Sequence, residues 1–241
     1  MTERRPDISV VIPIYNESAI LGRAVTDLHR NLSALEPPTP FEIILAENGS
    51  SDDTPAVARA LSEQLAEVHT FSYGEPNYGA ALRRGMLEAR GRYVICDEID
   101  LCDVDFHARA LALLRTGEAE LVVGSKAMHG SSDRRPFVRR LATKSINGML
   151  RILLGFRGTD THGLKAFRRD ALTCTATRCV VDKDLFASEF VIRAQRDGMR
   201  VVEIPISIAE KRPPSIQLGR RIPRVLRDLA RLVYVIRIRR S

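Results

Sequence analysis

The chain has 241 residues, of which 44% are hydrophobic, and it carries a formal net charge of +7. That length allows one α/β domain with a sizeable buried sheet and is short for two full domains. Tryptophan is absent and 5% of the residues are aromatic, which argues against a protein that stacks single-stranded nucleic acid on aromatic rings.

Short apolar strands alternate with helices through the first half of the chain. The pattern predicts strands over 8–12, 41–46, 68–72, 93–96 and 121–124. Helices are expected from Asn16 or Ser18 to about residue 35, from Ser51 onward, over 77–90 and over 106–114. Strands and helices that alternate at this spacing predict an α/β fold, with a mostly parallel sheet covered by helices on both faces.

The second half is less regular. Helices are expected over 134–157 and 185–196, and the first of them carries seven cations and no acid. A strand over 201–208 is interrupted by Pro205, which predicts an edge position or a bend. The last segment, 218–241, has apolar residues on one helical face and most of its arginines on the other.

The positive charge is concentrated in that last segment. Residues 219–241 contain eight arginines and one aspartate, and the other 218 residues contain 29 basic and 29 acidic side chains. A basic tail on a neutral body predicts a surface that meets phosphates. We therefore interpret 218–241 as a basic amphipathic helix on a membrane surface, with 134–157 as a second candidate and core packing as the alternative for both.

The cysteines and the N-terminus favour a cytoplasmic protein. Cys96, Cys102, Cys174 and Cys179 form neither a C-x-x-C pair nor a zinc ribbon. Residues 1–7 are charged and contain no apolar signal-peptide core. No stretch has the roughly 18 consecutive apolar residues of a membrane-spanning helix. We expect peripheral contact with the inner face of the membrane, and the oligomeric state stays open.

Polar loops follow three of the expected strands, over 13–17, 47–52 and 97–100. Ligands of an open parallel sheet bind outside the carboxyl ends of its strands. Each loop by itself could be a set of helix caps. Three loops that converge on one edge favour a ligand site.

The third loop places Asp97, Glu98 and Asp100 directly after an apolar strand. Neighbouring carboxylates repel one another, so a cation stabilises them when they are partly desolvated. Oxygen ligands with open positions suit Mg²⁺ or Mn²⁺, which would also hold a diphosphate. Capping of the next helix is the alternative, but Asp103 and Asp105 could supply that.

Several stretches resemble family 2 glycosyltransferases. Residues 10–17 (Val-Val-Ile-Pro-Ile-Tyr-Asn-Glu) resemble the opening motif, 47–52 (Glu-Asn-Gly-Ser-Ser-Asp) the second motif, and 77–82 an Asn-x-Gly helix start. Residues 124–126, 160–169 and 198–206 resemble the branch that makes polyprenyl- and dolichyl-phosphate sugars. The resemblance covers nearly the whole chain.

The resemblance implies a GT-A, Rossmann-like fold in one catalytic domain over 1–217, with a nucleotide-binding half of about 1–125 and an acceptor half of about 126–217. It implies a nucleotide-sugar donor, with Glu98 and Asp100 holding Mg²⁺ or Mn²⁺. The residues expected to bind the donor are Pro13, Tyr15, Glu17, Glu47, Asn48, Asp52, Asn77, Gly79 and Asp97. Lys126, Lys165 and Arg212 are candidate ligands of an acceptor phosphate.

The chain departs from the family pattern at three places. Glu98 stands where the metal motif usually begins with Asp, and Glu47 also replaces an Asp. The lysine that usually follows the last strand is missing, and Arg212 is the remaining candidate cation there.

The expected reaction is an inverting displacement at the anomeric carbon of a GDP- or UDP-sugar. A lipid phosphate is already ionised near neutral pH, because its second pKa is about 6, and needs no strong base. A hydroxyl acceptor would need a base, for which Asp182, Asp184 and Glu189 are the candidates. The resemblance to the branch named above implies a polyprenyl or dolichyl phosphate acceptor. The alternatives are a hydroxyl acceptor or a catalytically weak nucleotide-sugar-binding protein, and we expect no nucleic-acid partner.

Overall fold

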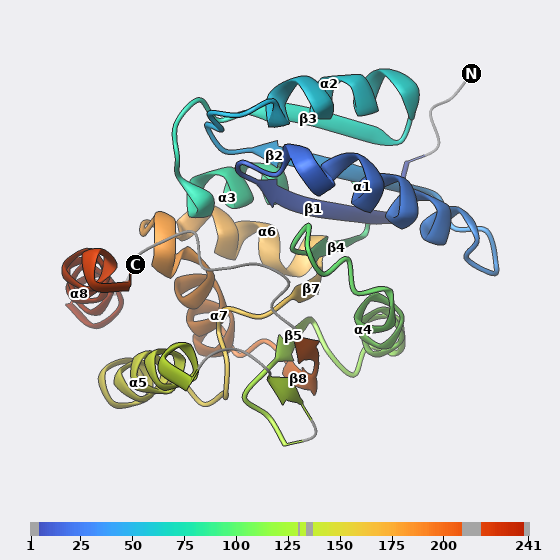
Figure 1. The fold of residues 1–241 in the computed structure, drawn as a ribbon. Helices are drawn as coiled ribbons and strands as arrows, with labels where there is room; N and C mark the ends of the chain where they lie inside the picture. Colours follow the sequence, from blue (N-terminus) through green and yellow to red (C-terminus); the bar gives the residue numbers. More distant parts are fainter. Residues whose placement is uncertain (1–4, 130, 134–136, 209–217, 239–241) are drawn as a thin grey trace.

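The computed structural model describes residues 5–129, 131–133, 137–208 and 218–238. At its centre lies a seven-stranded sheet with the order β3-β2-β1-β4-β7-β5-β8 (Figure 1). The strands are β1 (Ile8–Ile14), β2 (Phe41–Glu47), β3 (Val68–Ser72), β4 (Tyr93–Cys96), β5 (Leu121–Ser125), β7 (Lys165–Arg168) and β8 (Val201–Pro205). A separate short pair joins β6 (Ser132–Asp133) to β9 (Ser207–Ile208).

Helices cover both faces of the sheet, as the alternating pattern predicts. One face carries α1 (Ser18–Ser33), α2 (Thr54–Gln64) and α4 (Val104–Thr116). The other face carries α3 (Tyr78–Glu88), α6 (Arg169–Arg178), the short η1 (Lys183–Leu185) and α7 (Phe186–Arg196). Beyond these lie α5 (Phe137–Leu154), α8 (Leu218–Val233) and the π-helical η2 (Tyr234–Ile238), with α5 and α8 at one end of the molecule (Figure 1).

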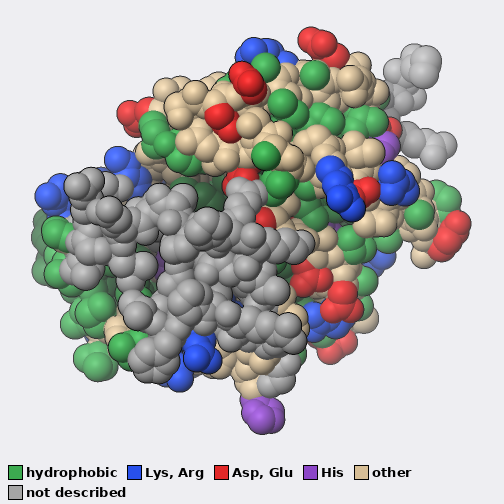
Figure 2. Space-filling view, viewed as in Figure 1, with side chains coloured by type: hydrophobic (Ala, Val, Ile, Leu, Met, Phe, Trp, Pro, Cys, Tyr) green, Lys and Arg blue, Asp and Glu red, His purple; other side chains and the backbone are tan. Residues whose placement is uncertain are grey.

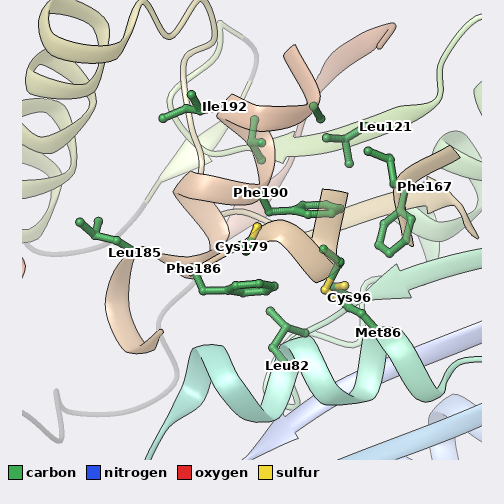
Figure 3. Close-up of a cluster of buried hydrophobic side chains, with 14 of the residues drawn as sticks. Leu82, Met86, Cys96, Leu121, Phe167, Cys179, Leu185, Phe186, Phe190 and Ile192 are labelled. Atoms are coloured by element: carbon green, nitrogen blue, oxygen red, sulfur yellow. The ribbon is translucent and has the colours of Figure 1, made fainter. Parts of the chain in front are cut away.

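Alternation along the strands divides the interior into two cores. In β1, Val11 points into the core under α3 and α7, whereas Val10 and Ile12 point into the core under α1 and α4. Figure 3 shows the first core, in which Phe186 and Phe190 of α7 pack over Leu82 and Met86 of α3. Because both faces are buried, these strands read as continuous apolar runs in the sequence.

The strand that the sequence pattern missed is β7, which runs antiparallel to both neighbours. It has four residues with a basic residue at each end, so no apolar run marks it. Its first residue, Lys165, pairs with Cys96 at the end of β4 and with Val123 of β5. An antiparallel strand begins where its neighbours end, so the segment before β7 arrives at the carboxyl edge of the sheet.

The C-terminal helix forms as predicted, and part of its apolar face packs against the protein, while its contact with a membrane stays a prediction. Leu229, Leu232 and Ile236 are buried in the same core as Phe186. On α5, Leu150 and Leu154 are buried there as well. Strand β8 lies at the edge of the sheet and ends at Pro205, as the proline predicts. The predicted boundary at 217, and Arg212, lie outside the described residues.

Candidate functional site at the carboxyl edge of the sheet

The loops after β1 and β2 are fastened to each other. The backbone N–H of Asn16 donates to Ser50 Oγ over 3.0 Å, and the N–H of Ser51 donates to Asn16 Oδ1 over 2.8 Å. Asp52 Oδ2 accepts from the backbone N–H and the hydroxyl of Ser18, at the start of α1. Asp52 therefore supplies α1 with a cap from a different loop, and the two loops form one rigid wall beside the exposed Tyr15.

Acid titration should expose the contribution of Asp52 to stability. Burial would raise the pKa of Asp52, but hydrogen bonds from Thr54 and Ser18 outweigh it and lower the pKa from 3.8 to about 2. A lowered pKa means that the ionised form stabilises the fold above pH 3.8 and that this contribution is lost as the pH falls through about 2. We expect Asp52→Ala to lower the unfolding free energy by about 1 kcal/mol at neutral pH. Denaturant unfolding should show this difference constant from pH 7 to 5 and absent below pH 2; a constant difference throughout would contradict the account.

The side chains after β2 and before α3 are hydrogen-bonded within the fold. Glu47 accepts from the backbone N–H of Ser50 and from the Ser72 hydroxyl. Asn48 Oδ1 accepts from the N–H of Asn77. These buried groups, which the sequence analysis assigned to the donor, build the pocket wall through their contacts with one another.

The start of α3 is pressed against η1. Asn77 Oδ1 accepts from the N–H groups of Ala80 and Lys183. A Cβ on Gly79 would lie 2.6 Å from Phe186 Cβ, so only glycine allows this approach. Tyr78, which stands between Asn77 and Gly79 in the chain, was not selected by the sequence analysis. It is 41% exposed. Burial of its hydroxyl and the nearby Glu98 carboxylate nevertheless raise the pKa of Tyr78 well above its ordinary value.

The carboxylates after β4 form the acidic part of the site. Glu98 and Asp100 are half-buried. Burial raises the pKa of Glu98; Lys126 opposes the rise, and Asp100 and Asp97 add to it. Negative charge is therefore concentrated at a partly desolvated position, which a bound cation would stabilise.

Asp97 is placed differently from its expected role. It is buried, with Oδ1 accepting from the Glu98 N–H over 2.7 Å and Oδ2 lying 2.5 Å from His107 Nε2. Both carboxylate oxygens thus have partners beneath the loop. The structure places Asp97 beneath the loop, and its expected contact with the donor stays a prediction.

The chemistry of the donor set suits a divalent cation that shares its ligands with a phosphate. Among the described residues, no three His, Cys, Asp or Glu side chains gather as a complete metal site. Mg²⁺ characteristically takes one or two carboxylates and completes its shell with water and substrate phosphates. The two acids Glu98 and Asp100 are compatible with that arrangement, in which the ligand supplies the remaining oxygens.

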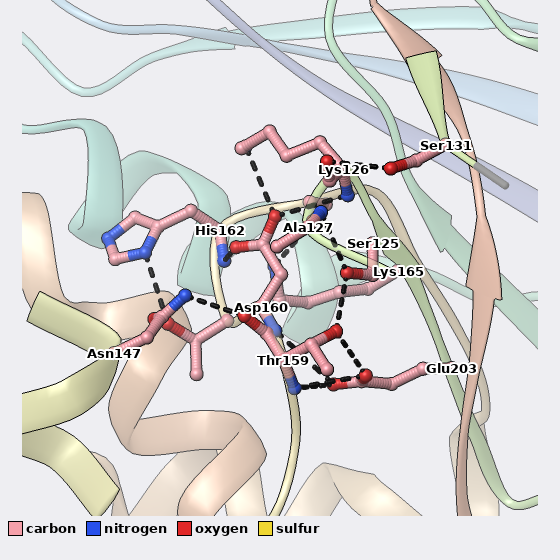
Figure 4. A network of polar contacts seen from close by, with 12 residues as sticks. Ser125, Lys126, Ala127, Ser131, Asn147, Thr159, Asp160, His162, Lys165 and Glu203 are labelled. Atoms are coloured by element: carbon pink, nitrogen blue, oxygen red, sulfur yellow. Dashed lines mark hydrogen bonds and ion pairs between the residues drawn. The ribbon is translucent and has the colours of Figure 1, made fainter. Parts of the chain in front are cut away.

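A buried basic pair lies opposite these acids. Lys126 follows β5, and its Nζ lies 3.5 Å from Asp160 Oδ2 (Figure 4). Burial lowers the pKa of Lys165, although Cys96 and Asp160 oppose the change. Burial would raise the pKa of Asp160, but Lys126 and the His162 N–H outweigh it and lower the pKa. Two buried lysines, Lys126 and Lys165, and the buried Asp160 thus lie beside the acidic loop.

The loop before β7 is fixed from below by a polar network. Thr159 donates its backbone N–H and its hydroxyl to Glu203 of β8, and Asn147 of α5 donates to the Thr159 carbonyl (Figure 4). Ser125 shares a hydrogen bond with the Thr159 hydroxyl. These contacts hold Asp160 and Lys165 at the edge of the sheet.

Gly163 brings this loop against β5. A Cβ there would lie 1.6 Å from the Gly124 carbonyl oxygen, so the backbone itself would have to move. We expect Gly163→Ala to lower the unfolding free energy by about 1–3 kcal/mol, the usual cost of overpacking. Gly22→Ala is the matched control, because Gly22 lies in α1 with nothing within 4 Å, and it should raise stability by about 0.5–1 kcal/mol. Thermal unfolding of both variants measures the difference. Equal stability of Gly163→Ala and Gly22→Ala would contradict the account.

Of the candidate bases, Glu189 does not lie at the carboxyl edge of the sheet. Glu189 is fully buried in α7, where it pairs with Arg193 over 2.8 Å and accepts from the N–H groups of Val180 and Val181. This position is a structural ion pair, which corrects the expectation of a base at Glu189. The side chain of Asp184 is not among those described.

A cavity of about 500 Å³ opens beside the acidic loop. It lies between the start of α4 and the end of β8, where Arg109 donates to the Pro205 carbonyl. Its lining residues are Asp100, Leu101, Cys102, Asp103, Val104, Asp105, Arg109, Pro205 and Ser207. The cavity adjoins the half-buried Asp100, so space for a ligand exists next to the carboxylates.

Loops after β1, β2, β4 and β5 and the start of β7 thus meet at one edge of an α/β sheet, with acids and cations on separate strands. This arrangement defines the class of α/β domains that bind a ligand at the carboxyl edge of the sheet. Residues 9–176 match the family model described as glycosyl transferase family 2. The chain belongs to that family of glycosyltransferases.

Relatives and structures agree with this assignment. Glycosyltransferase AglD of Haloferax volcanii is 32% identical over 232 residues, and dolichyl-phosphate beta-glucosyltransferase ALG5A of Trichomonas vaginalis is 26% identical over 212 residues. The alignments cover 92% and 83% of this chain but 37% and 64% of those proteins. Polyprenol monophosphomannose synthase of Mycolicibacterium smegmatis is 29% identical, over 84% of this chain and 77% of that protein.

The GT-A type of fold is confirmed by a solved structure. Glucosyl-3-phosphoglycerate synthase from Mycobacterium tuberculosis, in complex with UDP, superposes with a TM-score of 0.68 at 24% identity. The match covers 95% of this chain and 80% of that chain. The described part of the chain contains no helix that is both long and apolar enough to cross a bilayer.

Proposed function

We propose that this chain transfers a sugar, with inversion, from a GDP- or UDP-sugar to a polyprenyl or dolichyl phosphate at the cytoplasmic face of a membrane. The observation that carries the proposal is the placement of Glu98 and Asp100 at the end of β4 beside the buried pair Lys126 and Lys165. The two acids suit a cation that is bound together with a diphosphate, and the two lysines suit an anionic acceptor. Relatives named for transfer to dolichyl phosphate and for polyprenol monophosphomannose synthesis support the acceptor class.

In this proposal, one pair of residues binds the metal ion and another pair orients the acceptor. Glu98 and Asp100 would hold Mg²⁺ or Mn²⁺, which supplies charge neutralisation for the departing nucleoside diphosphate. A solved relative of the same fold is described in complex with Mn²⁺, UDP-glucose and phosphoglyceric acid, which supports a divalent ion here. Lys126 and Lys165 would orient the acceptor phosphate toward the anomeric carbon. An acceptor phosphate is its own nucleophile, so the burial of Glu189 is no obstacle.

Membrane contact is part of this proposal. Six of the ten large hydrophobic side chains exposed among the described residues lie on α5, α8 and η2, which concentrates them at one end. These are Leu141, Ile152, Leu153, Leu226, Tyr234 and Ile238. Figure 2 shows hydrophobic side chains at that end with Lys and Arg beside them. Arg237 of η2 donates to the Leu153 carbonyl of α5, which joins the two segments into one surface that suits anionic headgroups.

The test is a panel of radiolabelled nucleotide sugars, offered with short-chain polyprenyl phosphate and with the corresponding polyprenol, with and without EDTA. The proposal predicts a labelled lipid from the phosphate alone, and loss of product with EDTA that Mn²⁺ or Mg²⁺ restores. Transfer to the polyprenol or to a free saccharide would favour a hydroxyl acceptor instead. Binding of the nucleotide sugar without transfer to any acceptor would indicate a binding protein.

A further inference from the structure

A buried aspartate–histidine pair lies directly under the acidic loop. The side chain of Asp97 is fully buried and that of His107 is 3% exposed, with 2.5 Å between Oδ2 and Nε2. His107 comes from α4, whereas Asp97 directly follows the last residue of β4. The pair therefore ties the helix to the strand at the point where the acidic loop leaves the sheet.

The other atoms of this pair show that it does more than fill the core. His107 Nδ1 is buried with no hydrogen-bond partner among the described residues. A buried polar atom without a partner costs stability, so packing alone does not account for an imidazole at this position. The histidine is better explained by what it does to Asp97 than by packing.

Asp97, held by His107, in turn restricts the loop after β4 through its own hydrogen bonds. Its Oδ1 accepts from the Glu98 N–H, and its own N–H donates to Val11 O of β1. The Glu98 carbonyl accepts from the N–H groups of Leu101 and Cys102, which closes a turn around Asp100. Cys102 adopts a left-handed backbone conformation with φ of 43°, which is strained for a residue with a Cβ. The surrounding contacts, including the pair below, hold this turn in place.

We infer that His107 is a positioning residue, which acts through Asp97 to fix the directions of the Glu98 and Asp100 carboxylates and so sets the affinity for a divalent cation bound with a nucleoside diphosphate. The inference rests on the proposed role of these two acids. Removing a hydrogen-bond partner that orients metal ligands typically weakens metal binding about 10-fold to 100-fold.

The test measures Mn²⁺ binding by electron paramagnetic resonance in the presence of UDP and, separately, of GDP. Thermal unfolding is measured alongside, for three variants of the full chain. His107→Phe removes the donor and leaves Asp97 buried without it. His107→Gln keeps an N–H donor. The double variant Asp97→Leu/His107→Phe replaces both partners with apolar groups, which can be nearly neutral for stability.

The inference predicts Mn²⁺ affinity about 10-fold to 100-fold weaker for His107→Phe and close to the unaltered value for His107→Gln. It also predicts that the double variant recovers thermal stability without recovering Mn²⁺ affinity. A double variant that recovers both, or a His107→Phe variant that binds Mn²⁺ within threefold of the unaltered chain, would show a merely structural pair. If the unaltered chain binds no Mn²⁺ with either UDP or GDP, the proposed metal role fails and the inference falls with it. If the unaltered chain binds Mn²⁺ and the variants bind it equally well, the inference alone is overturned.

Discussion

Asp100→Asn is expected to reduce the rate of sugar transfer about 100-fold to 1000-fold, the usual effect of removing one group that stabilises charge in the transition state. The side chain keeps its shape but loses the charge that attracts a divalent cation. Because Asp100 also contributes to the repulsion that raises the pKa of Glu98, the variant should fold at least as well as the unaltered chain. Initial rates at saturating donor and acceptor, with Mn²⁺ titrated, would measure the effect.

Asp170→Asn is the matched control for this prediction. Asp170 lies after the far end of β7, at the opposite edge of the sheet, where its exposed side chain pairs with Arg168. We expect its transfer rate to stay within about twofold of the unaltered chain, since exposed ion pairs contribute little. An Asp100→Asn variant that retained more than a tenth of the activity at every Mn²⁺ concentration would contradict the assigned role.

Glu189→Gln should lower the unfolding free energy by about 3–5 kcal/mol, because it removes the carboxylate charge that pairs with the buried Arg193 guanidinium. The rate per folded molecule should change little. A general base would behave in the opposite way, losing about 100-fold to 10,000-fold in rate with little loss of stability. The effects of Glu189→Gln on stability and rate therefore distinguish transfer to a phosphate from transfer to a hydroxyl that Glu189 deprotonates.

The measurement combines thermal unfolding with transfer kinetics at a temperature well below the transition of the variant. Arg196→Gln, on the same helix but exposed, is the control for loss of a charge from α7. Stability unchanged in Glu189→Gln, together with a large loss of rate, would reverse our interpretation. A loss of both quantities that persists after correction for the folded fraction would also count against it.

The sequence predicts most of the sheet because buried strands such as β1 are continuous apolar runs. It does not predict β7, since a strand of four residues that begins with Lys165 and ends with Arg168 has no such run. The antiparallel direction of β7 is what brings Asp160 and Lys165 to the site. That direction follows from tertiary packing, which periodicity along the chain cannot show.

The loops of the candidate site follow neighbouring strands of one sheet, as the sequence indicates, whereas the roles of individual residues stay predictions. Glu47, Asn48 and Asp97 have the composition of ligand-binding residues, yet their polar atoms are bonded inside the fold. A sequence shows which polar residues follow a strand and not which way they turn. His107 was missed because a single histidine on an apolar helix face carries no local signal.

For the amphipathic helices, too, the sequence does not show what the side chains face. An apolar stripe with arginines opposite looks identical in sequence whether it meets lipid or a protein core. In α8, Leu229 and Leu232 are in the core, whereas Leu226 is half exposed. The charge concentration in the sequence predicts a basic surface, but only the packing shows which apolar residues remain for a membrane.

The most direct test is anomalous diffraction from crystals of the chain grown with Mn²⁺ and UDP. A single Mn²⁺ peak in contact with Glu98 and Asp100, bridging to the diphosphate with the uridine beside Tyr15, is the result we expect. A nucleotide bound away from the carboxyl edge of the sheet, or a metal held without either acid, would contradict it.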